Sequence, residues 1–573
     1  MVKRGKKDVK KGIILGIWDG HDSGAAILDG ADILFAVNEE RLTRRKLEIA
    51  FPTQSILLCL KETGLSPSQI KEIAISTWDF SKTLTRVFPH LKEEYYLIRR
   101  RKKPPGIFTN IKKIAKYRLT EIGPSSLYEK ITRKVVNKEL FKLGFSNYNL
   151  HLFNHHFCHA TSCAFASQLD KALVITLDGI GDGLSGSISL FEEGKIKPIS
   201  YISGKDSLGV FFEHVTNLLN MRELEDEGKV MALANYAYPV DDSKNPLINF
   251  FDVNGVNLKA RYSSIAMYYQ MKKILWLYPP EQFANMAQRA LEVFVTKLVE
   301  NGIKKTATSN IAMAGGVFSN IKVNMLIKDM ENIDKWFVFP HMGDGGLALG
   351  AAFALAHKLY NISSFDIKDL MFGPKFSDKE IESELKNKNL KYQYIEDIEK
   401  ETANRIAKGE IILWFQGRME IGPRALGARS ILALPNNEEI KDRLNLHLKK
   451  RVWYQPFCPS MLKEDALELL ENYNGEKSPY MTMGYMVKKE KLAELKGVIN
   501  VDGSCRPQIV DDDKSRYGKL LRELKKITGR GVVLNTSFNI HGEPIVCTPL
   551  DAIRTFETTG FDALVIENYL VEG

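Results

Sequence analysis

Apolar residues form short runs that end at Asp-Gly steps in two separate regions of the chain. GIILGIWDG, which starts at residue 12, is followed by a second apolar segment, ILFAVNEE. Far downstream, ALVITLDGIGDGLSGSISLFEEG again has an apolar run, an Asp-Gly step, a turn rich in Gly, Asp and Ser, and a returning run. Strands that enter tight turns have this pattern. The recurrence predicts an internal duplication, and two unrelated hairpins remain the alternative.

Glycine pairs follow two further predicted strands. FANMAQRALEVFVTKLVENG has the i, i+3, i+4, i+7 spacing of an amphipathic helix and leads into IAMAGGVFSN. This strand ends at Gly315 and Gly316, and HMGDGGLALGAA repeats the arrangement around Gly343–Gly346. Nucleotides can bind against the backbone at such strand-to-helix turns, so Gly315, Gly316 and the nearby Asn320 are nucleotide-binding candidates. With the duplication, these turns favour the ATP-binding architecture of actin, sugar kinases and Hsp70.

A change of pattern near residue 365 predicts a domain boundary. FSDKEIESELKNKNLKY reads as a charged helix, and the buried strand IILWFQG follows it. The remaining residues alternate strand and helix patterns over a length sufficient for an independent core. The predicted organisation is an α/β protein with a basic flexible tail at residues 1–12, a duplicated domain at 13–365 and a second α/β domain at 366–573.

Composition places the chain among ordinary globular proteins. A chain of 573 residues is too long for a single hydrophobic core. Its content of 44% hydrophobic and 26% charged residues is ordinary for a globular protein. No stretch approaches the ~18 unbroken apolar residues of a membrane helix, and the apolar run after the basic N-terminus is too short for a signal peptide. Six cysteines without a CxxC pair indicate reduced thiols. We therefore expect a cytoplasmic protein without a membrane partner.

The formal net charge of +10 raises the question of a nucleic-acid partner. The most basic run, residues 99–103, stands before Pro104 and Pro105, and such runs are usually solvated helix ends. An RNA-facing patch is the alternative. Lysine-rich proteins often carry such charge as a solubilising surface, so we expect small anionic substrates and no nucleic acid.

Three histidines in the segment FNHHFCHATS indicate a metal site. His155 and His159 are four residues apart and share a face if the segment is helical. Two imidazoles completed by two carboxylates suit iron, manganese or zinc better than magnesium. Asp178, in the first Asp-Gly step after the histidines, and Asp344, in the GDGG turn, are the carboxylate candidates. Histidines that are hydrogen-bonded in a core remain the alternative.

The second domain is rich in basic residues on Gly- and Pro-containing segments. GRMEIGPRALGARSILALP carries several arginines, and planar guanidinium groups suit bidentate phosphate contacts. Lys449 and Arg451 would point the same way in an extended segment, as would a polar pair at the end of the apolar strand VVLNTS. Each arginine alone is explained by a surface ion pair. Together they predict a polyanion site, for which the candidates are Arg418, Arg424, Arg429, Lys449, Arg451, Arg506, Asn535 and Ser537.

These segments resemble the carbamoyltransferase family of nodulation-factor and antibiotic-tailoring O-carbamoyltransferases over nearly the whole chain. The most specific pieces are HHFCHATS, LDGIGDGLSG, EDEGKVMALA, AGGVFSN, GRMEIGPRALGARS and LNTSFNIHGEPIV. The resemblance implies a ribonuclease-H-like or actin-type N-terminal domain and a C-terminal domain that makes a carbamoyl-adenylate from ATP, with Mg²⁺, and carbamoyl phosphate. It puts a metal, iron first with manganese or zinc as alternatives, on the two histidines and two aspartates. It puts carbamoyl phosphate and ATP on seven of the polyanion-site candidates, namely Arg418, Arg424, Lys449, Arg451, Arg506, Asn535 and Ser537.

The resemblance also implies that His21, in DGHDSG, lies near the acceptor hydroxyl, where an imidazole can take a proton. A turn histidine bonded to Asp22 is the alternative. One motif departs from the family pattern: Val452 and Gln455 stand where charged residues are expected, which weakens the prediction for carbamoyl phosphate contacts. A homodimer is a further expectation. The sequence is compatible with a sugar, an aminoglycoside or a polyketide as the acceptor and does not choose among them.

Two other functions are compatible with the sequence. The first is a tRNA-modifying fusion that transfers a threonylcarbamoyl group to adenosine, because its two catalytic domains share these architectures. This function is disfavoured by the motif GRMEIGPRALGARS, since that motif belongs to the O-carbamoyl family. The second is a nucleotide-binding regulator with an inactive site.

Overall fold

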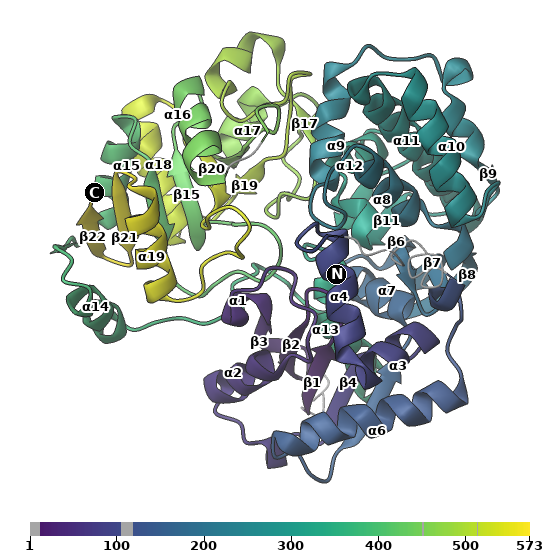
Figure 1. Ribbon diagram of the computed structural model, residues 1–573. Helices are drawn as coiled ribbons and strands as arrows, with labels where there is room; N and C mark the ends of the chain where they lie inside the picture. The colour runs from purple at the N-terminus through teal and green to yellow at the C-terminus, as the bar shows by residue number, and fades with distance from the viewer. Residues whose placement is uncertain (1–11, 105–117, 450–451, 513) are drawn as a thin grey trace, which may run out of the picture. The chain divides into compact units, whose positions relative to one another are not determined.

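The computed structural model describes residues 12–104, 118–449, 452–512 and 514–573 (Figure 1). Its contacts divide the chain into two compact units. Unit 1 contains the residues up to Glu39 together with Leu47–Val230 and Pro239–Lys368, and unit 2 contains Glu40–Lys46, Met231–Tyr238 and Asp369–Gly573. Two short segments of the N-terminal half therefore pack with unit 2, which the sequence pattern did not indicate. The ranges 13–365 and 366–573 stay predictions about separately folding domains.

Unit 1 contains two five-stranded sheets with the same topology (Figure 1). The strand orders are β3-β2-β1-β4-β5 and β8-β7-β6-β11-β12. In each sheet the first three strands form an antiparallel meander and the other two run parallel to the first strand. The equal order and directions confirm the predicted duplication. The strands are β1 (Ile13–Trp18), β2 (Gly24–Asp29), β3 (Asp32–Asn38), β4 (Glu72–Ser76), β5 (Asn149–Phe153), β6 (Lys171–Gly181), β7 (Leu184–Glu192), β8 (Lys195–Ser203), β11 (Asn310–Ala314) and β12 (Lys335–Val338).

Two helices in contact with each other pack on these sheets. α7 (His155–Ala166) lies against β6 and β11, and α13 (Leu347–Tyr360) lies against β1 and β4. α7 is almost wholly buried, α13 is buried over residues 347–356, and these buried parts consist mainly of small and apolar residues. Gly350 allows their close approach, because a Cβ at this position would stand 2.2 Å from the carbonyl oxygen of Cys158. This packing brings the N-terminal ends of two distant segments together.

The remaining elements of unit 1 cover the sheets and include the predicted amphipathic helix, which is observed as α11. Within the described residues, no helix is long and apolar enough to cross a membrane. The helices and the small β9-β10 hairpin are α2 (Thr53–Thr63), α3 (Phe80–Val87), α4 (Pro89–Arg99), α6 (Ser126–Lys142), α8 (Leu208–Leu218), β9 (Phe251–Asn254), β10 (Asn257–Ala260), α10 (Ser264–Leu277), α11 (Pro280–Thr306) and α12 (Ile321–Lys328).

Unit 2 is built on an eight-stranded mixed sheet of order β13-β22-β21-β14-β15-β20-β16-β19. Trp414 of β14 (Ile412–Phe415) is fully buried in a core to which α15 (Ile398–Ala407) and α18 (Arg516–Thr528) contribute. The predicted charged helix is α14, whose first turn is fixed by a capping box of Ser377 and Glu380. The strands are β13 (Gln393–Tyr394), β14 (Ile412–Phe415), β15 (Arg429–Ala433), β16 (Cys458–Leu462), β19 (Gln508–Val510), β20 (Val532–Ser537), β21 (Ala563–Ile566) and β22 (Tyr569–Glu572).

The helices of unit 2 and a two-stranded β17-β18 ribbon complete an α/β protein, as the sequence predicted. These elements are α1 (Glu40–Thr43), α14 (Asp378–Asn387), α15 (Ile398–Ala407), α16 (Glu438–Arg443), α17 (Lys463–Leu469), β17 (Tyr485–Met486), β18 (Ser504–Cys505), α18 (Arg516–Thr528) and α19 (Pro549–Thr559). A further helix, α9 (Glu227–Leu233), begins in unit 1 and ends in unit 2.

Candidate functional site

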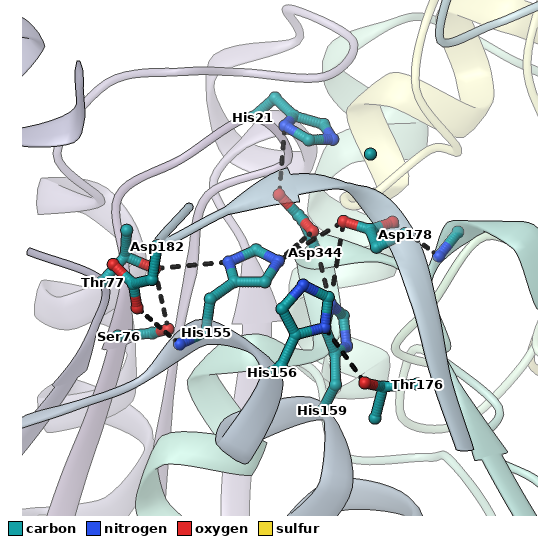
Figure 2. A network of polar contacts seen from close by, with 12 residues as sticks. His21, Ser76, Thr77, His155, His156, His159, Thr176, Asp178, Asp182 and Asp344 are labelled. Atoms are coloured by element: carbon teal, nitrogen blue, oxygen red, sulfur yellow. Dashed lines mark hydrogen bonds and ion pairs between the residues drawn. The ribbon is translucent and has the colours of Figure 1, made fainter. Parts of the chain in front are cut away.

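The four predicted metal ligands lie together in unit 1. α7 begins at His155, because the side chain of Asn154 caps it by accepting two backbone N–H bonds. His155 and His159 therefore lie one turn apart on the same face. Asp178 comes from β6, and Asp344 from the turn before α13 (Figure 2). One ligand atom from each of the four residues lies within 4.8 Å of all the others.

The imidazole nitrogens point at the carboxylates. His155 Nε2 is 3.3 Å from Asp178 Oδ2 and 3.3 Å from Asp344 Oδ1. His159 Nε2 is 3.9 Å and 3.5 Å from the same two oxygens. Within the described chain, His159 Nε2 and Asp344 Oδ1 are buried and have no hydrogen-bond partner. Buried polar atoms are nearly always satisfied, so these residues fit a cation held between them.

Surrounding groups orient the candidate ligands. His155 Nδ1 lies 3.3 Å from Thr77 Oγ1, and the His155 backbone N–H donates to Asp182 Oδ2 at 2.7 Å. Asp178 Oδ1 accepts the backbone N–H of Gly316 at 2.7 Å. Such contacts fix the ring orientation and leave Nε2 directed at the cluster. The third histidine, His156, instead contacts Thr176 through Nδ1 and is not part of the set (Figure 2).

The cluster favours positive charge between its carboxylates. Burial by itself lowers the pKa of His155, but the carboxylates of Asp344 and Asp178 outweigh it and raise that pKa to about 10. Burial by itself raises the pKa of Asp344, but His21 and His155 hold it well below its usual value. A proton on an imidazole or a bound cation supplies the charge that these carboxylates require.

The predicted nucleotide-binding glycines lie beside the four candidate metal ligands. Gly315 has φ +103°, a conformation that favours glycine, and a Cβ on Gly316 would stand 2.7 Å from Asp178 Oδ1. Asn320 caps α12 and exchanges side-chain hydrogen bonds with Gln288. The glycine turn thus supports a candidate metal ligand directly. Nucleotide binding by Gly315, Gly316 and Asn320 stays a prediction.

His21 lies next to the cluster. It follows β1, where Trp18 Nε1 donates to the His21 carbonyl oxygen at 2.9 Å. His21 Nδ1 is 3.3 Å from Asp344 Oδ2 and 3.4 Å from the hydroxyl of Tyr96. The two oxygens of Asp344 thus face different partners, with Oδ1 toward the histidines of α7 and Oδ2 toward His21 (Figure 2). The His21 side chain is 24% exposed and can be reached by a bound molecule.

A cavity of about 1070 Å³ in unit 1 opens onto this group. A cavity of this size accommodates a drug-sized molecule. Its wall combines cluster residues with aromatic and charged side chains from α3, α4, α8 and α10. Among the lining residues are His21, His155, Asp178, Asp344, Trp18, Lys82, Tyr96, Arg99, Glu213, Glu223, Tyr268 and Tyr269.

The first two residues of the basic run 99–103 contradict the expectation of a solvated helix end, whereas residues 101–103 are exposed as expected. Arg99 and Arg100 are buried, with 8% and 6% of their surface exposed. Arg99 is ion-paired with Glu213 and Glu223, and Arg100 with Glu225 at 2.5 Å. The sequence did contain a signal for this pairing, because residues 221–229 are rich in acidic groups whose charge is opposite to that of the basic run. Their pairing was missed because the two runs are far apart in the chain.

The arginine-rich segment of unit 2 forms a folded loop between β14 and β15. Arg429 is fully buried, stacks 3.5 Å from the ring centre of Phe415 and donates to the carbonyl oxygen of Gln416 at 2.8 Å. Glu420 Oε1 accepts three backbone N–H bonds from residues 426, 428 and 429. The side chains of Arg429 and Glu420 thus stabilise the loop through hydrogen bonds to its backbone. Arg418 donates to the carbonyl oxygens of residues 372 and 373, and Arg424 is half-buried.

Two of the other predicted polyanion residues lie close together. Asn535 of β20 pairs in register with Cys458 of β16, and Arg506 Nη2 lies 3.0 Å from Cys458 Sγ. Asn535 donates to Ser460 Oγ at 2.9 Å, while its Oδ1 has no hydrogen-bond partner among the described residues. Ser537 donates to Asn539 Oδ1 at 2.6 Å.

The predicted Lys-x-Arg step cannot be located. The backbone of Lys449 ends a helical segment, Leu444–Lys449, which differs from the expected extended conformation. The side chain of Lys449 and the whole of Arg451 lie outside the described residues. The seven residues therefore stay a predicted binding set.

Comparison with known proteins identifies the family. Residues 13–353 match the family described as Carbamoyltransferase N-terminus, and residues 403–573 match Carbamoyltransferase C-terminus. The chain belongs to the carbamoyltransferase family. The nodulation protein NolNO of Sinorhizobium fredii is 31% identical over 96% of this chain and 79% of its own length. An uncharacterized protein of Methanocaldococcus jannaschii is 34% identical over 98% of this carbamoyltransferase and 99% of its own length.

Solved structures show a more distant likeness to this carbamoyltransferase. Full-length HypF, in a phosphate- and nucleotide-bound form, aligns with 63% of the chain and 57% of its own at 13% identity and a TM-score of 0.37. Component A of the (R)-2-hydroxyglutaryl-CoA dehydratase of Acidaminococcus fermentans aligns with 61% of the chain and 98% of its own at 13% identity and a TM-score of 0.35. At these TM-scores the likeness has no bearing on the site.

Proposed function

We propose that this carbamoyltransferase is an ATP-dependent O-carbamoyltransferase that makes a carbamoyl-adenylate in unit 2 and transfers the carbamoyl group to an acceptor hydroxyl in unit 1. The observation that carries the proposal is the group formed by His155, His159, Asp178 and Asp344, with His21 beside it, in the wall of one large cavity. Perturbed titratable groups in a cavity are typical of active sites.

The first step joins two anions. In unit 2, the phosphate of carbamoyl phosphate leaves as inorganic phosphate after attack by water, and the resulting carbamate oxygen attacks the α-phosphorus of ATP. The bond to the β-phosphate breaks, and pyrophosphate leaves. Because both reactants are negative, the predicted residues Arg418, Arg424, Lys449, Arg451, Arg506, Asn535 and Ser537 would neutralise and align them.

The second step transfers the carbamoyl group. The acceptor oxygen attacks the carbamoyl carbon, the bond from that carbon to the phosphate oxygen breaks, and AMP leaves. His21 takes the proton of the acceptor hydroxyl. Asp344 Oδ2, which is 3.3 Å from His21 Nδ1, stabilises the imidazolium that forms. The surrounding cavity wall limits access of water to the activated carbamoyl group.

His155, His159, Asp178 and Asp344 would hold the metal. Their two nitrogen and two oxygen donors suit iron first, with manganese or zinc as alternatives. When bound, such an ion supplies Lewis-acid stabilisation of negative charge on a carbonyl or phosphate oxygen. The residues themselves fit this role because His159 Nε2 and Asp344 Oδ1 have no other hydrogen-bond partner in the described chain.

A pyrophosphate-release assay on the purified chain tests the proposed function. We expect release to require both ATP and carbamoyl phosphate and to be independent of threonine and bicarbonate. A strict requirement for threonine and bicarbonate would instead identify the threonylcarbamoyl-transfer alternative. Tight ATP binding without adenylate formation, with any carbamoyl donor, would identify the inactive regulator.

A further inference from the structure

The C-terminal end of α10 exposes large apolar side chains. α10 packs against α8 and α11 (Figure 1) through a buried face that includes Met267 and Met271. On its outer side, Trp276 is 90% exposed and Leu277 is 73% exposed. Removing either side chain from water would be favourable, because both expose a large apolar surface. Two such neighbours at one helix end form a protruding apolar tip.

Basic residues stand directly before this tip. Lys272 and Lys273 are both exposed and occupy the turn that precedes Trp276. A helix places residues i, i+3, i+4 and i+7 on one face. Tyr269, the two lysines and Trp276 have these spacings, so aromatic and basic groups alternate along the outer face of α10.

The same face leads to the cavity of unit 1. Ile265, Tyr268 and Tyr269 of α10 all line that cavity, and Tyr269 is 55% exposed. With a rise of 1.5 Å per residue, Trp276 lies roughly 10 Å along the helix from Tyr269. One exposed strip therefore connects the cavity wall with the apolar tip.

We propose that the tip of α10, formed by Trp276 and Leu277 with Lys272 and Lys273, binds the surface of an anionic lipid membrane. Tryptophan is enriched at the level of lipid headgroups, where its ring is partly apolar and partly polar. Lysines near a membrane surface are attracted to acidic headgroups by their opposite charge. Interfacial binding of this kind requires no spanning helix.

The shape and charge of the tip fit a membrane better than a protein partner. A stable protein interface needs about 800 Å² from each partner, far more than two side chains at a helix end provide. A second copy related by twofold symmetry would bring the same patch against itself, and thus lysine near lysine. An acidic lipid surface accepts both the apolar groups and the positive charges.

Membrane binding would place the cavity near lipid headgroups. If the proposed O-carbamoyl transfer holds, the acceptor hydroxyl belongs to a membrane-anchored amphiphile whose polar part enters the cavity along α10. This substrate class rests on the proposed function, whereas membrane binding does not. A vesicle-binding measurement without ATP or carbamoyl phosphate therefore tests the inference independently of the reaction.

The experiment is co-sedimentation of the full-length chain with vesicles of phosphatidylcholine alone or mixed equally with phosphatidylglycerol. We expect binding to the mixed vesicles, weakened by high salt, and a blue shift of tryptophan fluorescence that is lost in Trp276→Phe. The double variant Trp276→Ser, Leu277→Ser should lower partitioning about tenfold or more. Lys272→Gln with Lys273→Gln should lower it about tenfold at low salt.

Phe141→Ser is the matched control, because Phe141 is 76% exposed on α6 and should not affect partitioning. Absence of vesicle binding by the wild type would overturn the inference, as would equal losses in the control and the tip variant. Size-exclusion chromatography tests the alternative that a second copy of the chain binds the tip. A dimer that the tip variant dissociates would assign the tip to a second copy of the chain instead.

Discussion

His159 and Asp344 meet where α7 contacts α13, with His159 Nε2 3.5 Å from Asp344 Oδ1. Each of the two atoms is buried and has no hydrogen-bond partner within the described residues. Since the packing of two helices brings these residues together, the geometry of the candidate metal centre depends on the core of unit 1.

Replacing a cluster histidine should abolish metal binding. His159→Ala removes one donor and leaves the remaining three with an incomplete site, so we expect the metal content of the purified chain, measured by elemental mass spectrometry, to fall at least tenfold. His156→Gln is the matched control, because His156 is equally buried in α7 but contacts Thr176. Equal loss of metal in both variants would contradict this assignment of ligands.

Gly316→Ala should weaken the same site through a backbone effect. The added Cβ would stand 2.7 Å from Asp178 Oδ1, so this carboxylate must move. We expect metal affinity, measured by competition with a chelator, to fall by roughly 10- to 100-fold. Gly343→Ala should be neutral, since nothing lies within 4 Å of its Cβ position and its φ is −77°. Unchanged affinity in Gly316→Ala would rule out support of Asp178 by this turn.

His21→Ala should separate the two proposed steps. The variant lacks the base for the acceptor proton, so carbamoyl transfer should fall by roughly 10²- to 10⁴-fold. Pyrophosphate release depends on unit 2 and should continue. Labelled carbamoyl phosphate follows transfer, and a coupled phosphate assay follows pyrophosphate. A parallel loss of both activities would show that His21 acts outside the transfer step.

Arg429→Met should destabilise unit 2. The guanidinium is fully buried, and its loss leaves carbonyl oxygens of the loop without donors and removes the stack on Phe415. We expect the free energy of unfolding in urea to fall by about 3 kcal/mol or more. Arg554→Met should cost about 1 kcal/mol or less, because that side chain is 49% exposed in an ion pair with Glu543. Similar losses in both variants would disprove a supporting role of Arg429.

Lys322 should make stability depend on alkaline pH. Burial lowers its pKa to about 8, below the ordinary 10.5, even though Glu292 acts in the opposite direction. The unfolded chain therefore keeps this proton to higher pH than the folded chain, so wild-type stability should rise relative to Lys322→Met between pH 8 and 10.5. The full difference is roughly 3 kcal/mol. Unfolding of both proteins at pH 7 and pH 10.5 measures it, and a pH-independent difference would contradict the shift.

The candidate metal site was predictable because its four residues occur in short sequence patterns. A four-residue spacing places His155 and His159 on one helical face whatever the helix packs against. The Asp-Gly steps marked Asp178 and Asp344 as the ends of buried segments. By contrast, the burial of Arg99 was not predictable, since it depends on carboxylates of Glu213 and Glu223 that come from another part of the chain.

The arginine-rich loop of unit 2 also shows which features the sequence reveals and which require the structure. Sequence alone indicated that the loop before β15 is rich in arginine, but it gave these arginines equivalent roles. The structure distinguishes them, because Arg429 is enclosed by the loop and Arg418 and Arg424 are only partly buried. Which guanidinium faces a ligand is a property of loop packing, and residue type does not encode it.

The sequence by itself determined the α/β class, the duplicated strand pattern, the family and the four candidate metal ligands, because periodicity and short motifs depend on residues close together in the chain. Only the tertiary structure decided that His21 adjoins Asp344, that Arg99 and Arg100 are paired inside unit 1, and that α10 connects an exposed apolar tip with the cavity. These relationships arise from packing between distant segments, which local spacing cannot specify.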